Sequence, residues 1–113
     1  MPRGSCLCGG VRFNVEGDIP GPDACHCTMC RKHSGHYFAS GDVSKQAVTI
    51  EGEDQLAWYQ SSERVRRGFC KTCGSSLFWD PIRSDKIAVA MGALDDPTGT
   101  RLRMHIHTAD NGD

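Results

Sequence analysis

The chain's seven cysteines lie in three short stretches: Cys6-Leu7-Cys8, Cys25-His26-Cys27-Thr28-Met29-Cys30 and Cys70-Lys71-Thr72-Cys73. The first and last stretches each supply two thiolates, and four thiolates close one tetrahedral zinc site. The middle stretch supplies three, which can hold a second zinc ion and leave its fourth position open. A closed site is structural, whereas an open site can bind a substrate. The cysteine pattern therefore favours a zinc enzyme with one structural and one catalytic ion.

A disulfide framework explains the cysteines less well. Their number is odd, Cys6 and Cys8 are too close in the chain to make good partners, and the sequence begins without an apolar export signal. A thioredoxin-like role for Cys70-Lys71-Thr72-Cys73 would need a βαβ context, which the sequence lacks.

Three alternatives stay open for the middle stretch. A histidine could complete a second closed site, the cysteines could be free redox thiols, or Cys25 or Cys30 could join Cys70 and Cys73. The histidines concerned are His26, His33 and His36.

The composition of the chain narrows the classes of function that it could have. The chain has 113 residues, a formal net charge of -1, a pI near 6.5 and a mean hydropathy of -0.44. These values predict one domain and give no general attraction to nucleic acid or anionic membrane. No apolar run approaches the roughly 18–20 residues that span a bilayer. We expect a cytoplasmic protein with reduced thiols and no membrane partner.

The rest of the sequence predicts a mainly β, antiparallel fold. Short stretches with alternating apolar residues are separated by turn-forming Gly, Pro, Asp and Ser, a pattern typical of short antiparallel strands. One short helix is expected over 28–34, ended by Gly35. The expected strands cover 11–15, 46–51, 55–60, 64–69, 76–80, 86–91 and 102–107.

Three motifs of this chain resemble those of the glutathione-dependent formaldehyde-activating enzyme family, which includes domains similar to centromere protein V. The motifs are Gly4-Ser5-Cys6-Leu7-Cys8-Gly9, Cys25-His26-Cys27-Thr28-Met29-Cys30-Arg31-Lys32 and Gly68-Phe69-Cys70-Lys71-Thr72-Cys73-Gly74-Ser75-Ser76-Leu77-Phe78-Trp79. The resemblance implies a zinc-stabilised β-tent fold. It implies structural zinc at Cys6, Cys8, Cys70 and Cys73, and catalytic zinc at Cys25, Cys27 and Cys30.

The resemblance also implies a carbon–sulfur lyase, similar to S-(hydroxymethyl)glutathione synthase. Such an enzyme adds a thiol, glutathione, to formaldehyde or another small aldehyde. The alternative is a non-catalytic zinc-binding module for a protein or nucleic-acid partner, although the net charge makes nucleic acid a poor candidate. Residues 1–113 are expected to form a single domain that lacks the C-terminal tail common in the family.

Other polar and aromatic residues have simpler expected roles. We expect a solvated face for Arg64, Arg66 and Arg67, with carboxylate binding as the alternative. Arg31 and Lys32 could offset an anionic zinc–thiolate centre or bind a substrate carboxylate. Surface positions are expected for His105 and His107, with catalysis as the less favoured alternative, and a turn for Asp95 and Asp96. Core positions are expected for Trp58, Phe78 and Trp79, with an aromatic pocket wall as the alternative for one of them.

Overall fold

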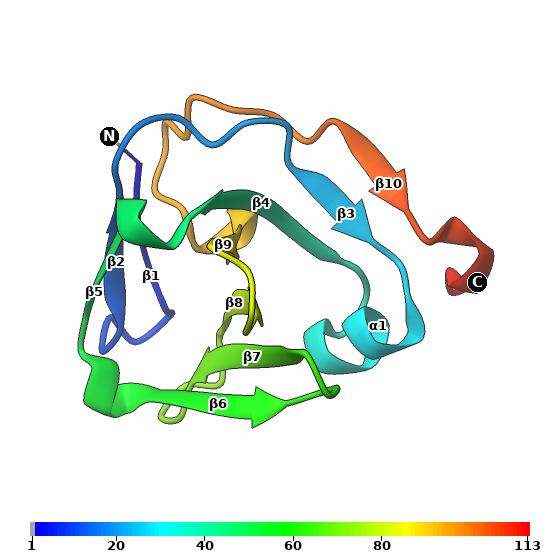
Figure 1. The fold of residues 1–113 in the computed structure, drawn as a ribbon, viewed down its shortest axis with the longest axis horizontal. Helices are drawn as coiled ribbons and strands as arrows, with labels where there is room; N and C mark the ends of the chain where they lie inside the picture. Colours follow the sequence, from blue (N-terminus) through cyan, green and yellow to red (C-terminus); the bar gives the residue numbers. More distant parts are fainter. Residues whose placement is uncertain (1) are drawn as a thin grey trace.

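The computed structural model describes residues 2–113 and has two β-sheets and one α-helix. The smaller sheet has the strand order β1-β2-β5, and the larger has the order β10-β3-β4-β9-β8-β7-β6. All pairings are antiparallel except β3 with β10, which is parallel. Figure 1 shows the small sheet at one side of the molecule and β3, β10 and α1 at the other. The mainly β prediction is confirmed.

The elements are short and closely spaced along the chain. The strands are β1 (Arg3–Ser5), β2 (Arg12–Val15), β3 (Asp23–Cys25), β4 (Phe38–Ser44), β5 (Val48–Glu51), β6 (Leu56–Gln60), β7 (Val65–Cys70), β8 (Ser76–Pro81), β9 (Lys86–Ala90) and β10 (Met104–Ile106). The helix α1 covers Thr28–Ser34, and 3-10 turns cover Lys45–Ala47, Glu53–Gln55, Met91–Ala93 and Thr108–Asp110. No helix within 2–113 is long and apolar enough to cross a bilayer.

Each strand that the alternation predicts is present, with ends that differ by at most two residues, and α1 has the predicted bounds. Its end is set by Gly35, which adopts a left-handed φ of 95°. Strands β1, β3 and β4 were not predicted. Strand β4 contains Ser40, Gly41 and Asp42, residues that are typical of a loop. Gly41 is required there because a Cβ at this position would collide with Ile19, so tertiary packing decides this strand.

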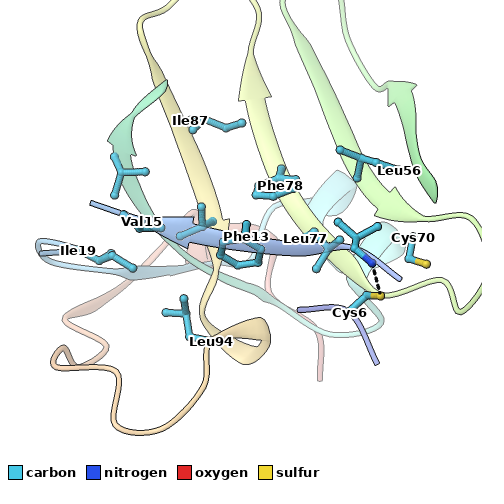
Figure 2. Close-up of a cluster of buried hydrophobic side chains, with 13 residues drawn as sticks. Cys6, Phe13, Val15, Ile19, Leu56, Cys70, Leu77, Phe78, Ile87 and Leu94 are labelled. Carbon is cyan, nitrogen blue, oxygen red and sulfur yellow. Dashed lines mark hydrogen bonds between the residues drawn. The ribbon is translucent and has the colours of Figure 1, made fainter. Parts of the chain in front are cut away.

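The large sheet has two different faces because neighbouring residues on a strand point to opposite sides. On one face, the paired residues Phe78 and Val89 pack against Phe13 and Val15 of the small sheet. Figure 2 shows this cluster, with Cys6 and Cys70 at one end. On the other face, Trp79 pairs with Ala88 and is only partly buried. That second face forms the floor of a cavity.

Asp80 is a charged residue at the edge of the core, and its side chain is buried, with 3% exposure. Arg66 Nε donates a hydrogen bond of 2.7 Å to Asp80 Oδ2, and Lys45 Nζ lies 2.9 Å from Asp80 Oδ1. The Arg66 guanidinium also lies 3.8 Å from the ring centre of Trp58. Burial alone would raise the pKa of Asp80, but Lys45 and Arg66 outweigh it and hold this pKa below its usual value.

Replacing Asp80 with Asn should destabilise the fold by about 1.5–3 kcal/mol, the usual value of a hydrogen bond to a charged group. Because the pKa of Asp80 is lowered on folding, its contribution is complete above the unfolded-state value of 3.8. The difference between variant and wild type should therefore stay constant from pH 8 to pH 5 in urea unfolding. The exposed Asp85→Asn variant is the control, and equal losses in both variants would contradict this role.

Candidate metal centres and cavity

The first group of sulfurs joins two loops that are far apart in the sequence. The sulfurs of Cys6, Cys8, Cys70 and Cys73 lie within 4.8 Å of one another. Cys8 Sγ is 3.6 Å from Cys6 Sγ and 3.8 Å from Cys70 Sγ. A zinc–sulfur bond of about 2.3 Å gives a tetrahedron whose edge is about 3.8 Å. The four sulfurs therefore fit a closed tetrahedral zinc site, and all are free thiols.

Neighbouring donors prepare this group to bind a cation. The Val11 amide donates to Cys6 Sγ at 3.3 Å, as Figure 2 shows. The hydroxyl of Ser75 lies 3.2 Å from Cys73 Sγ and, with backbone N–H groups, lowers the pKa of Cys73 to about 5. Gly74 turns the chain with a φ of +79°. Such second-shell contacts orient the ligands of a metal.

The second group of sulfurs forms where β3 leads into α1. Cys25 is the last residue of β3, Cys27 caps α1, and Cys30 lies in its first turn. Their three sulfurs lie within 4.8 Å of one another. Cys27 Sγ accepts a hydrogen bond from the Cys30 amide at 3.4 Å. The strand-to-helix turn thus brings together all three cysteines of the middle stretch, and they are separate from the four-sulfur group.

No histidine or carboxylate of residues 2–113 joins the three sulfurs. His26 points elsewhere, and its Nε2 lies 2.7 Å from His105 Nδ1. His33 Nδ1 lies 3.5 Å from the Ser76 hydroxyl, and its ring packs edge-on against Phe69. Within the described part of the chain, the alternative of a second site closed by histidine therefore has no support.

A cavity of about 370 Å³ opens beside the three sulfurs. Its floor is the second face of the large sheet, where the small side chain of Ala88 leaves space next to Trp79. The cation Arg67 and the carboxylates of Asp23 and Asp42 line this cavity, together with His107. Burial and the nearby carboxylate of Asp42 raise the pKa of Asp23. The three-sulfur group therefore faces a space that contains side chains of both charge signs.

Comparison with known proteins agrees with this geometry. The sequence profile described as "Glutathione-dependent formaldehyde-activating enzyme" matches residues 1–110. The chain belongs to this family. A Halomonas elongata protein named for the same family is 33% identical over 102 residues, which cover 82% of this chain and 65% of that protein. A Schizosaccharomyces pombe protein named an uncharacterized lyase is 31% identical over 81 residues, covering 70% of this chain and 58% of that protein.

This family member spans less than two thirds of the length of those two relatives. Its fold is similar to the crystal structure of a Rhodobacter sphaeroides protein, with a TM-score of 0.74 and 22% identity. That similarity covers 91% of this chain and 98% of the other.

One expectation about this family member's polar residues needs correction. Arg67 is not on a solvated face: it is 3% exposed, because Arg66 and Arg67 point to opposite faces of β7 and the cavity face is covered. His105 and His107 are exposed, as expected, but His105 contacts His26 and His107 lines the cavity.

Of the aromatic residues expected in the core, Phe78 is buried, whereas Trp79 lines the cavity.

Asp23 and Asp42 also line the cavity, although the sequence does not predict them as site residues. Register accounts for their position: Asp23 pairs with Ser40, two residues before Asp42, and Asp42 pairs with Ala88. All four residues line the cavity. Only a correct assignment of β3 and β4 would have placed these carboxylates on the same face as the middle cysteines.

Changing Cys73 to Ser should remove one zinc ion and leave the chain unfolded or aggregated at 25 °C. Structural zinc contributes roughly 10–16 kcal/mol in small domains, as much as the whole stability of about 5–15 kcal/mol. Metal analysis and circular dichroism would measure both effects.

Cys27→Ser is the matched control for Cys73→Ser. Serine is a better helix cap than cysteine, so this variant loses a thiolate while α1 keeps its cap. It should stay folded and lose only the other zinc ion. A Cys73→Ser protein with wild-type thermal stability would contradict the structural assignment.

Proposed function

We propose that the chain is a zinc-dependent carbon–sulfur lyase that adds the thiol of glutathione to formaldehyde or a similar small aldehyde. The observation that carries this proposal is the three-sulfur group, which has no fourth ligand within residues 2–113 and opens onto a cavity. Membership of the family and the names of its relatives support the same chemistry.

We assign the structural zinc to Cys6, Cys8, Cys70 and Cys73, and the catalytic zinc to Cys25, Cys27 and Cys30. Burial raises the pKa of Cys25 to about 12, so three thiolates at neutral pH require a cation between them. A bound zinc ion would supply Lewis acidity and lower the pKa of a thiol that enters its open position.

The reaction joins the glutathione sulfur to the carbonyl carbon. A carbon–sulfur bond forms and the carbon–oxygen π bond breaks. The thiol loses its proton, and the new hydroxyl oxygen gains one. The chain's role is to hold the thiol and exclude water from it. The reverse reaction, cleavage of the same bond, is the lyase direction.

The cavity suits a small zwitterionic thiol. Its volume of about 370 Å³ lies within the usual range for small-molecule sites, roughly 300–1,000 Å³. Glutathione carries two carboxylates and one ammonium group, and the lining has the cation Arg67 and the carboxylates Asp23 and Asp42. Trp79 and Phe38 provide apolar walls for its methylene groups.

Metal analysis should show two zinc ions per chain, and zinc-edge X-ray absorption should show an average of 3.5 coordinated sulfurs per ion. Adding glutathione should raise this average towards four, because only the three-cysteine ion can gain a sulfur. The Cys27→Ser protein is the control and should show one zinc ion and no change with glutathione. Two ions already saturated by protein ligands would refute the proposed chemistry.

Activity should follow the same group of residues. The wild-type protein should speed the exchange between formaldehyde and S-(hydroxymethyl)glutathione above the spontaneous rate, as measured by NMR exchange spectroscopy. Cys27→Ser should abolish the increase while its circular dichroism spectrum is unchanged. An increase that survives in this variant would place the chemistry elsewhere.

A further inference from the structure

Within residues 2–113, one buried cation beside the three-sulfur group has no carboxylate in ion-pair contact. Arg67 is 3% exposed, and its side chain donates two hydrogen bonds within residues 2–113. Nε donates to the Ser61 hydroxyl at 3.1 Å, and Nη1 donates to Cys30 Sγ at 3.4 Å. Neither a hydroxyl nor a neutral thiol balances the charge of a guanidinium.

Its neighbour on β7 shows the usual arrangement. Arg66 is more exposed, yet it pairs with the carboxylate of Asp80 at 2.7 Å. The ion pairs formed within the described residues both involve Asp80, and neither includes Arg67. A buried charge is unfavourable unless an opposite charge accompanies it. Asp23 and Asp42 line the same cavity without pairing with Arg67, so the sulfur that Arg67 contacts is the candidate for its partner.

The charge of a metal-loaded three-cysteine group supplies that partner. Three thiolates and one divalent cation leave one net negative charge, which matches the single positive charge of Arg67. Within residues 2–113, no arginine makes such a contact with the four-cysteine group; the Val11 amide donates to Cys6 Sγ, and the Ser75 hydroxyl lies 3.2 Å from Cys73 Sγ.

Other cations near the three-sulfur group are less suitable. Burial and the charge of Arg67 lower the pKa of His33, so this histidine is neutral at pH 7. Lys32 is exposed, and Arg31 extends away to donate to the Asp110 carbonyl at 3.1 Å. The expectation that Arg31 and Lys32 offset the centre is thus better met by Arg67.

We propose that Arg67 is the counter-ion of the three-cysteine centre, a positioning residue that stabilises its bound metal and allows a further anionic sulfur to enter. This inference rests on the proposed function. The hydrogen bond to Cys30 Sγ also orients one ligand, and the guanidinium lies on the cavity wall, where an incoming thiolate would add negative charge.

The test is stepwise zinc release from the full zinc-loaded chain to a chromogenic chelator. Arg67→Met keeps much of the side-chain volume but removes the charge, and should weaken one of the two zinc sites by about 10- to 100-fold, the usual effect of losing a second-shell partner. The other site should be unchanged. Arg67→Lys restores the charge and should recover most of the affinity, which a merely structural role would not predict.

Arg64→Met is the matched control, because Arg64 is exposed and lies just before β7. It should release both ions as the wild type does. If Arg67→Met holds both ions within threefold of wild-type affinity, or if Arg67→Lys releases one ion as readily as Arg67→Met, the inference is wrong. If Arg67→Met does not fold, the comparison of Arg67→Lys with wild type decides: retention of both ions supports the counter-ion role, and loss of one overturns it.

This test separates the inference from the proposed function. A wild-type chain that binds a single zinc ion would refute both. A wild-type chain with two ions, and Arg67 variants that keep both, would refute only the counter-ion role.

Discussion

The spacing of four sulfurs is the constraint on which the domain depends. Cys6 and Cys8 lie in the loop between β1 and β2, whereas Cys70 and Cys73 flank the turn between β7 and β8. Their convergence joins the small sheet to the large one at one end of the core, where Cys6 and Cys70 are buried among apolar side chains. A domain of this size has a small core, so a cation bound at this junction would add stability where apolar packing is limited.

The packing of the small sheet against the large sheet also determines where the cavity lies. One face of β8 and β9 is occupied by Phe13 and Val15 of the small sheet, so the opposite face is available for α1 and β3 to cover. Because Ala88 is small, that cover does not fill the space. The three-sulfur group, at the junction of β3 and α1, is therefore placed at the cavity by the same sheet that forms the core.

The sequence predicted the features that are local and missed those that depend on pairing. Alternation located β2 and β5 to β10, and Gly35 located the end of α1, because these signals lie within a few residues. The division of cysteines into four and three followed from their spacing, and the structure groups them in the same way. Strand β4 was missed because Gly41 is there to make room for Ile19, a contact that no local pattern reveals.

Arg67 shows why the rest of the site could not be read from the sequence. Adjacent arginines on a strand face opposite sides, but which side is buried depends on what covers the sheet. Here Arg66 meets a carboxylate, whereas Arg67 meets a sulfur. The two cysteine groups are consequently stabilised by different means. Neutral groups of Val11 and Ser75 contact the four-sulfur group, whereas the three-sulfur group has a full positive charge beside it. A metal centre whose charge is balanced in this way would accept another anionic ligand at lower electrostatic cost, as the proposed reaction requires.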